Sequence, residues 1–181
     1  MALSKKTPFQ ILVELDRRFI QLGGVSGSKS TVARTWSGIG FRLGERYFVS
    51  PLGEISEIIN EPPLTQLPGV KPWVMGVANM RGRLLPVFNF AGFLGVQPVG
   101  DAILKRVLLV ARDDVFIGLL VDEAFGLQHF SATSYVRQLP EQYRVVFPYI
   151  EGYFERDHPW LVFRPFALAG YQRFNAVAQD T

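Results

Sequence analysis

From Trp36 onward, the chain consists of short apolar runs separated by glycines, prolines and charged residues. The largely apolar run 47–52 follows Gly-Glu-Arg at 44–46, and the run 115–121 follows Arg-Asp-Asp at 112–114. Runs of this length, joined by turn-forming or charged residues, are typical of β-hairpins. Because such runs recur along the chain, the sequence predicts a β-sandwich or small β-barrels with little helix.

An internal similarity predicts that these strands form two related lobes. Residues 75–91 align with residues 151–167, and residues 46–55 align more loosely with residues 115–124. The matched positions include Gly76 with Gly152, Phe90 with Phe166 and Glu54 with Glu123. Two similar β lobes that pack together would leave a groove between them.

The residues before the first predicted strand, 1–35, predict an amphipathic helix followed by a flexible linker. Thr7 and Gln10 have the spacing of a capping box, and a Gly- and Ser-rich stretch follows the helical pattern. The helix either packs on its own domain or docks on a partner, and the sequence leaves both possibilities open. The rest of the chain divides into a β domain over residues 36–170 and a C-terminal helical tail over residues 171–181.

Residues that carry catalysis or bind metals are scarce. The chain has no cysteine, which excludes disulfides, thiolate catalysis and zinc sites with cysteine ligands. Its two histidines, His129 and His158, stand apart and have no partner at the spacing of metal ligands. The sequence therefore predicts a protein with no enzymatic activity, no metal site and no cofactor.

The distribution of apolar residues bears on the cellular compartment. No apolar run approaches the roughly 18 residues that a membrane-spanning helix requires. Glu14 and Asp16 interrupt the N-terminal apolar run, which argues against a signal peptide. Together with the lack of cysteine, these observations predict a cytoplasmic protein.

The charge pattern leaves one alternative function, nucleic-acid binding by a β-barrel protein. Lys and Arg outnumber Asp and Glu by 19 to 16, and Arg81 and Arg83 fall within or beside a predicted turn. The basic residues are scattered in pairs such as Lys5-Lys6 and do not form a block, which argues against this alternative.

An unusual local pattern lies at residues 74–90, where two apolar runs flank Asn79-Met80-Arg81-Gly82-Arg83. The flanking runs have the composition of strands, and Asn79 and Gly82 both tolerate a positive φ, so a hairpin with Arg81 at its exposed turn is predicted. Arg81 is either a solvated turn residue or the anchor of a protein interface. An anchor is chemically reasonable because the planar guanidinium makes several hydrogen bonds while its stem packs on apolar surface.

The same stretch resembles the motif of a known family. The pattern Gly-Val-x-Asn-x-Arg-Gly, followed by Pro-Val, runs from Gly76 to Val87 and resembles that of the CheW family, the scaffold proteins of bacterial chemosensory arrays. The resemblance extends from about Trp36 to Gly170 and is strongest to the family members of type IV pilus twitching motility. It implies a mainly β fold of two SH3-like five-stranded β-barrel lobes side by side, with short N-terminal and C-terminal helices.

The resemblance also implies a function, that of a non-enzymatic adaptor that couples a chemoreceptor to a histidine kinase in an array controlling twitching motility. The expected partners are the cytoplasmic tip of a methyl-accepting chemoreceptor and the regulatory domain of a CheA-type histidine kinase, with no nucleic acid. The protein would be cytoplasmic and associated with membrane-anchored receptor arrays, without inserting into the membrane itself.

The resemblance assigns four residues to receptor binding. Arg81 would be the polar anchor, Ile55 part of the apolar wall of the groove, and Gly76 a residue of backbone geometry. Glu57 would either pair with a basic receptor side chain or face solvent. One departure is Asn89, which stands where many members have Asp. An Asn side chain keeps the capping function without the charge, so we expect the fold to be unaffected.

Overall fold

The computed structural model describes residues 35–97, 99 and 104–177, except for the side chains of residues 144–147 and 173. The helix and linker expected over residues 1–35 lie outside the described residues, apart from Thr35, the first residue of β1. The strands are β1 (Thr35–Leu43), β2 (Arg46–Pro51), β3 (Glu57–Ile59), β4 (Val74–Met80), β5 (Arg83–Asn89), β6 (Arg106–Arg112), β7 (Val115–Val121), β8 (Glu123–Ser131), β9 (Tyr135–Val136), β10 (Ile150–Glu155) and β11 (Pro159–Phe163). The helices are α2 (Phe90–Leu94), α3 (Pro165–Ala169) and α4 (Gln172–Asn175), with the 3-10 helices η2 (Ala132–Ser134) and η3 (Glu141–Tyr149).

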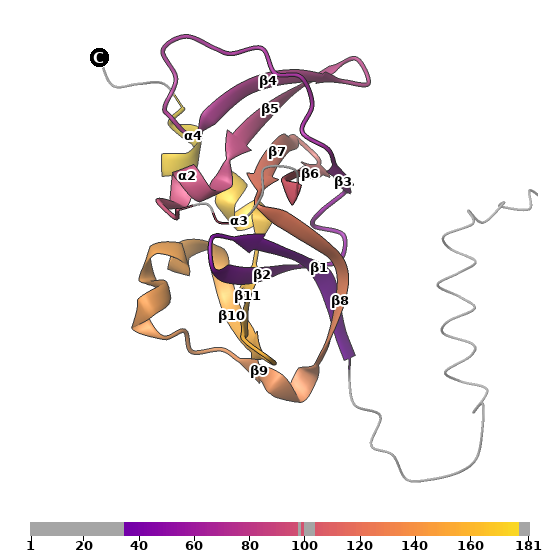
Figure 1. Ribbon diagram of the computed structural model, residues 1–181, viewed down its shortest axis with the longest axis vertical. Helices are drawn as coiled ribbons and strands as arrows, with labels where there is room; N and C mark the ends of the chain where they lie inside the picture. Colours follow the sequence, from indigo (N-terminus) through magenta and orange to yellow (C-terminus); the bar gives the residue numbers. More distant parts are fainter. Residues whose placement is uncertain (1–34, 98, 100–103, 178–181) are drawn as a thin grey trace, which may run out of the picture. The chain divides into compact units, whose positions relative to one another are not determined.

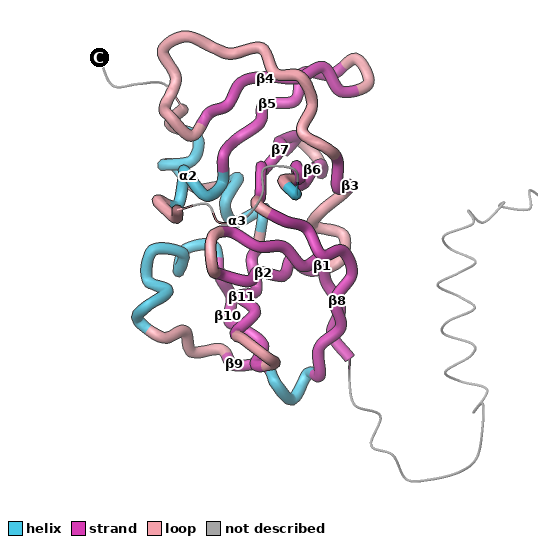
Figure 2. The backbone as a smooth tube through the Cα atoms, viewed as in Figure 1, coloured by secondary structure: helices cyan, strands magenta, loops and turns pink. Residues whose placement is uncertain are grey.

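Within the described residues, the strands form two sheets (Figure 1). One sheet is six-stranded, in the order β8-β1-β2-β11-β10-β9, and the other is five-stranded, in the order β3-β6-β7-β5-β4. The mainly β fold with two lobes is therefore confirmed, although one sheet has six strands because the short β9 extends it. The helices α2 and α3 lie near the boundary between the two groups of strands (Figure 2).

Both hairpins predicted from turn residues are present. β1 and β2 pair antiparallel up to Leu43 and Arg46, and Gly44 adopts a φ of 57° at their turn. β6 and β7 pair up to Arg112 and Val115, and Asp113 adopts a φ of 53°. Positive φ values at such tight turns match the backbone twist of the flanking strands.

The internal similarity of the sequence is confirmed by the topology. β4 and β5 are followed by α2, as β10 and β11 are followed by α3. β5 pairs parallel with β7, and in the same way β11 pairs parallel with β2. Each lobe is thus built on two antiparallel hairpins whose second strands pair in parallel.

The two sheets also exchange a strand. After β2, the chain crosses to the five-stranded sheet, where β3 pairs antiparallel with β6. After β7, the chain crosses to the six-stranded sheet, where β8 pairs antiparallel with β1. Glu54 lies in the first crossing and Asp122 in the second. Each sheet is therefore completed by a strand that follows a hairpin of the other sheet.

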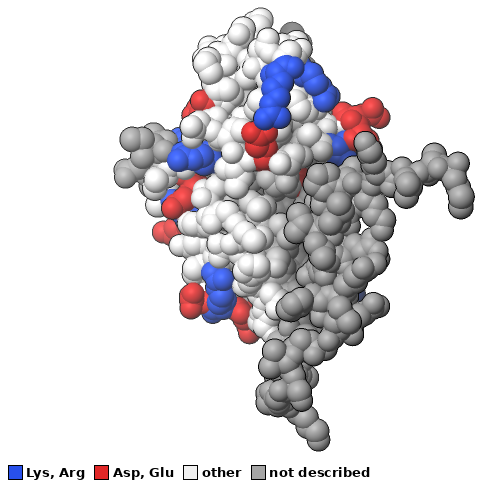
Figure 3. Space-filling view, turned by 90° about the vertical axis from the view of Figure 1, so that its right-hand side faces the viewer, with Lys and Arg blue, Asp and Glu red and all other residues white. Residues whose placement is uncertain are grey.

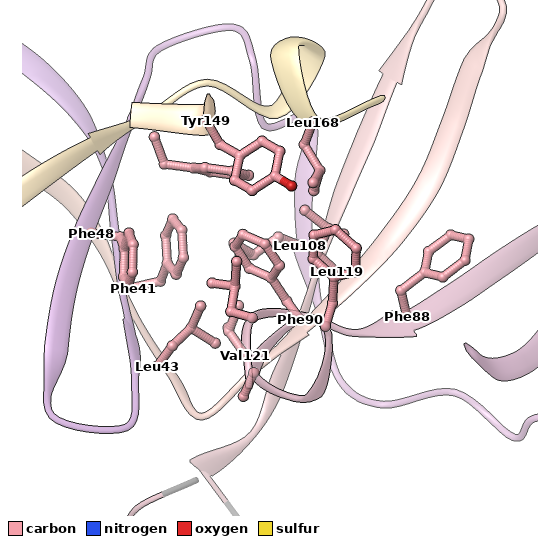
Figure 4. Close-up of a cluster of buried hydrophobic side chains, with 14 of the residues drawn as sticks. Phe41, Leu43, Phe48, Phe88, Phe90, Leu108, Leu119, Val121, Tyr149 and Leu168 are labelled. Atoms are coloured by element: carbon pink, nitrogen blue, oxygen red, sulfur yellow. The ribbon is translucent and has the colours of Figure 1, made fainter. Parts of the chain in front are cut away.

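A core of buried side chains lies between the sheets and belongs to both (Figure 4). The rings of Phe41 and Phe48, from the six-stranded sheet, stack with their centroids 5.3 Å apart. Leu108 and Leu119 contribute from the five-stranded sheet and Phe90 from α2, and each is at most 1% exposed. Since burial of one such side chain contributes about 1.5–3 kcal/mol, this shared core is a large part of what holds the two sheets together.

Each sheet has a second, private interior. The interior of the five-stranded sheet is aliphatic and includes Leu85, Val87 and Leu109. The interior of the six-stranded sheet is aromatic, and the rings of Phe130 and Phe154 stack there with centroids 4.7 Å apart. The two lobes therefore share a strand arrangement but not the chemistry of their packing.

His158 lies against the aromatic interior of the six-stranded sheet. Its ring centroid is 3.5 Å from that of Tyr47 and 5.2 Å from that of Trp160. Its Nε2 atom is shielded from solvent and has no hydrogen-bond partner among the described residues. Burial lowers the pKa of His158 below the ordinary value of 6.5, and it outweighs Asp157, which acts in the opposite direction.

We expect His158 to make the thermal stability of the protein depend on pH. Because the folded-state pKa is lowered, the neutral ring stabilises the fold above pH 6.5, and this contribution is lost as the pH falls below 6.5 toward the folded-state pKa. The midpoint of thermal unfolding should therefore decrease between about pH 7.5 and about pH 5.5, and His158→Phe should flatten this decrease. The control is His129→Gln, which should leave the pH dependence in place. An unchanged slope in His158→Phe would contradict the prediction.

Candidate functional site

The described residues do not assemble a metal centre. No group of three or more His, Asp or Glu side chains able to hold a metal ion occurs among them. His129 hydrogen-bonds to Ser37, with 2.7 Å between Nδ1 and Oγ, on an exposed part of β1 and β8. In the same described part of the chain, no helix has the length and apolar character needed to cross a membrane.

The hairpin of β4 and β5 carries the arginine that the sequence singled out. Met80 and Arg83 form its last pair, and the two residues between them, Arg81 and Gly82, have φ values of 52° and 79°. Two-residue hairpin turns with positive φ at both positions fit the twist of the strands. Asn79 was expected to be a turn residue, but it is the penultimate residue of β4, and its side chain accepts a hydrogen bond of 2.9 Å from the Gly82 N–H.

The structure brings Arg81 and Glu57 together. The Nη2 atom of Arg81 lies 3.0 and 3.2 Å from the two carboxylate oxygens of Glu57, which is the first residue of β3. The Arg81 side chain remains 76% exposed and that of Glu57 38% exposed. An ion pair this exposed adds little stability, so it is better understood as a feature of the surface than as a support of the fold.

The pair leaves most of the hydrogen-bonding capacity of Arg81 unused. A guanidinium has five N–H donors. Nε and Nη1 of Arg81 make no hydrogen bond to any described residue, since only Nη2 contacts Glu57. A partner could therefore bind Arg81 without first breaking its contact with Glu57.

Ile55 and Glu57 occupy different environments although only one residue separates them. Ile55 is 8% exposed and packs in the shared core. The N–H of Ser56, between them, donates a hydrogen bond of 2.8 Å to the carbonyl of Leu109 in β6. The segment thus buries Ile55 and presents Glu57 toward Arg81.

Gly76 is a residue of backbone geometry and does not join the Arg81–Glu57 pair. It has a φ of 139° and lies in an irregularity of the β4–β5 ladder. Next to it, Val77 exchanges two backbone hydrogen bonds with Thr65, of 2.8 and 2.9 Å. A Cβ atom at Gly76 would lie 2.3 Å from the carbonyl oxygen of Thr65. Glycine at this position therefore lets the segment around Thr65 lie along β4.

Leu84 is a feature of this surface that the sequence interpretation missed. It lies directly opposite Asn79 in the hairpin and is 71% exposed. The sequence contained a signal for this exposure, because side chains alternate between the two faces of a strand. Leu84 therefore points away from the face that carries Leu85 and Val87, which are fully buried. Exposed apolar side chains beside charged ones are common in protein interfaces.

The charges on the face shown in Figure 3 do not form a basic patch. Among the described side chains visible there, the basic ones lie in small groups beside acidic ones, with an uncharged area between the upper and lower groups (Figure 3). Such a face suits a partner with apolar and a few charged side chains better than a polyanion.

Asn89, the departure from the family pattern, keeps its structural role. It is the N-cap of α2, and its side chain accepts a hydrogen bond of 3.0 Å from the Gly92 N–H. The expectation that an amide replaces the carboxylate as a cap is therefore confirmed.

Comparison with known proteins gives consistent matches. The model of the CheW-like domain matches residues 37–172. Protein PilI of Pseudomonas aeruginosa is 50% identical over 173 residues, which cover 96% of this chain and 97% of PilI. Chemotaxis protein CheW of Thermotoga maritima is 30% identical over 89 residues, covering 49% of this chain and 58% of that protein. The crystal structure of the scaffolding protein CheW from Thermoanaerobacter tengcongensis has the same fold, with a TM-score of 0.61, 20% identity, and coverage of 71% of this chain and 88% of that chain.

We expect Gly76→Ala to destabilise the protein more than Gly82→Ala. At Gly82 the φ is 79° and a Cβ would meet no atom within 4 Å, so only the cost of positive φ applies, about 1–2 kcal/mol. At Gly76 the strained φ and the clash with the Thr65 carbonyl act together, so we expect a loss of about 3 kcal/mol or more. Urea unfolding of both variants measures the difference. Equal losses would show that the close approach of Thr65 is relaxed at no cost.

Proposed function

The chain belongs to the CheW-like family, and from this membership we propose that it is a non-enzymatic adaptor in a chemosensory array. The adaptor couples the cytoplasmic tip of a methyl-accepting chemoreceptor to the regulatory domain of a CheA-type histidine kinase. Through this coupling it contributes to the control of type IV pilus twitching motility. The protein works in the cytoplasm, at the membrane-anchored receptors that it links to the kinase.

The assignment to a pilus system is supported by the extent of the sequence matches. PilI aligns over nearly the whole length of this chain, including most of the residues before the CheW-like domain. The chemotaxis protein CheW of Thermotoga maritima aligns with about half of it. Because PilI also matches the N-terminal segment, we infer the cellular role of this protein from PilI and not from the shorter CheW match.

The observation that carries the receptor assignment is the exposed Arg81–Glu57 pair on a rigid hairpin. Two of the residues assigned to receptor binding come from separate strands, β3 and β4–β5, and meet on the surface. Arg81 retains donors that no described residue uses, and the exposed Leu84 lies in the same hairpin, opposite Asn79. A planar cation with free donors next to apolar surface has the composition of an interface anchor.

Ile55 and Gly76 contribute to the proposed site in a less direct way. Ile55 lies beneath the surface, and its burial fixes the backbone that presents Glu57. Gly76 fixes the path of the segment that lies along β4. We therefore assign direct receptor contact to Arg81 and Glu57, and support of the site to Ile55 and Gly76.

Removal of Arg81 should weaken receptor binding and leave the fold intact. We expect Arg81→Ala to cost roughly 1–3 kcal/mol in affinity for a chemoreceptor signalling-tip fragment, because truncation of an anchor leaves its partner groups unpaired. Its unfolding free energy should change by less than about 0.5 kcal/mol, since the side chain is exposed. Calorimetric titration of the native and variant proteins measures the affinity, and urea unfolding measures the stability.

The matched control is Arg83→Ala, two residues away in the same hairpin. The guanidinium of Arg83 stacks over the ring of Phe116, at 4.0 Å from its centroid, and no acidic side chain of the described residues pairs with it as Glu57 pairs with Arg81. We expect this variant to bind the fragment as the native protein does. Equal loss in both variants would point to nonspecific attraction of charge. Binding of a nucleic acid by the native protein that weakens steeply with added salt would favour the nucleic-acid alternative. No binding by the native protein would overturn the receptor assignment.

A further inference from the structure

An ion pair between a buried carboxylate, that of Glu54, and the partly exposed guanidinium of Arg164 holds the point where the chain first crosses between the sheets. Glu54 is 6% exposed, and its Oε1 atom lies 2.6 Å from Nη2 of Arg164. Arg164 directly follows β11, at the opposite end of the domain sequence, and its Nη1 lies 2.7 Å from a carboxylate oxygen of Glu151 in β10. One guanidinium therefore ties the crossing segment to two strands of the six-stranded sheet.

Arg164 is itself held in place. The backbone N–H of Arg164 donates a hydrogen bond of 2.9 Å to the carbonyl of Tyr149, and Arg164 is the N-cap residue of α3. The side-chain hydrogen bonds to Glu151 and to Glu54 raise the pKa of Arg164, so the group stays charged. A buried carboxylate such as that of Glu54 is destabilising without its cation, so the crossing segment depends on this contact.

The crossing segment leads directly to the proposed receptor site. Glu54 precedes Ile55, and the N–H of Ser56 donates a hydrogen bond to Leu109 in β6, so the backbone from Glu54 to Glu57 is short and held by contacts along its length. Glu57 then contacts Arg81. A displacement at Glu54 would be carried along this short segment to the carboxylate that faces Arg81.

We propose that Arg164 is a positioning residue for the receptor site: through Glu54 it sets the place of Glu57 relative to Arg81. The inference rests on the proposed receptor-binding function of that site. It adds a residue that directly follows β11 of the six-stranded sheet to a surface formed by the five-stranded sheet. The bare sequence pattern around Arg81 contains nothing that points to it.

The fold supplies a matched control at the second crossing. Here the arginine is the buried partner: Arg42 contacts Glu123, with 3.2 Å between Nη2 and Oε2, and Glu123 is the counterpart of Glu54 in the internal repeat. Glu123 begins β8, which joins the six-stranded sheet and leads away from β3. Loss of Arg42 should therefore cost stability, as loss of Arg164 should, without moving Glu57.

The test compares Arg164→Met with Arg42→Met in the full chain, with the receptor-tip fragment as ligand and at a temperature where both variants are folded by circular dichroism. Both should unfold at lower temperature than the native protein. Only Arg164→Met should weaken fragment binding, by roughly fivefold to tenfold, and Arg164→Lys should restore part of the loss. Adding Arg81→Ala to Arg164→Met should cost less than Arg81→Ala alone. Unchanged binding in Arg164→Met, or equal weakening in both Met variants, would overturn the inference.

A second measurement needs no partner. Hydrogen exchange of the amides at residues 54–59 should become faster in Arg164→Met and stay near the native rate in Arg42→Met, and unchanged exchange in Arg164→Met would refute the positioning role. If Arg164→Met fails to fold, Glu54→Gln removes the same charge contact and is tested by the same measurements of fragment binding and hydrogen exchange. Failure of the native protein to bind the fragment would reject the proposed function, whereas normal Arg81 dependence with no effect of Arg164 would reject this inference alone.

Discussion

The packing of two apolar sheet faces against each other is the constraint on which the rest of this structure depends. The side chains of Phe41 and Phe48 from one sheet and of Leu108 and Leu119 from the other are buried in this contact. The shared core contains more buried residues than either private interior, so a large part of the apolar burial stabilises both sheets together. The exchange of β3 and β8 adds backbone hydrogen bonds to the same joint, so that the lobes are connected by pairing as well as by packing.

This joint explains how a surface residue pair can be held with defined geometry. Arg81 lies on the two-residue turn between the paired strands β4 and β5. Glu57 begins β3, which pairs with β6 in the five-stranded sheet, although the preceding strand, β2, belongs to the six-stranded sheet. Neither residue lies on a long loop. The proposed receptor site, if held in this way, would lose little conformational freedom on association, which favours affinity.

Local patterns were sufficient for the hairpins, and longer-range features were not. Turn residues predicted the hairpins β1–β2 and β6–β7, because strand alternation and tight turns depend on residues that are close in the sequence. The internal similarity predicted two related lobes. The exchange of strands, the position of β9, and the contact between Glu54 and Arg164 join residues far apart in the chain, and no local signal marks them. At the site, the family pattern pointed to Arg81 and Glu57, but that Asn79 braces the turn and that Ile55 is nearly buried needed the structure.

The parallel pairing of β2 with β11 has a consequence for the order in which the protein is made. During synthesis β2 and its antiparallel neighbour β1 emerge early, but its parallel neighbour β11 emerges only after all strands of the five-stranded sheet. All neighbours of β4, β5, β6 and β7 in the five-stranded sheet lie within residues 57–121, so that sheet can assemble first. Until β11 has emerged, the nascent chain carries an incomplete six-stranded sheet, and this interval is when a chaperone would be of most use.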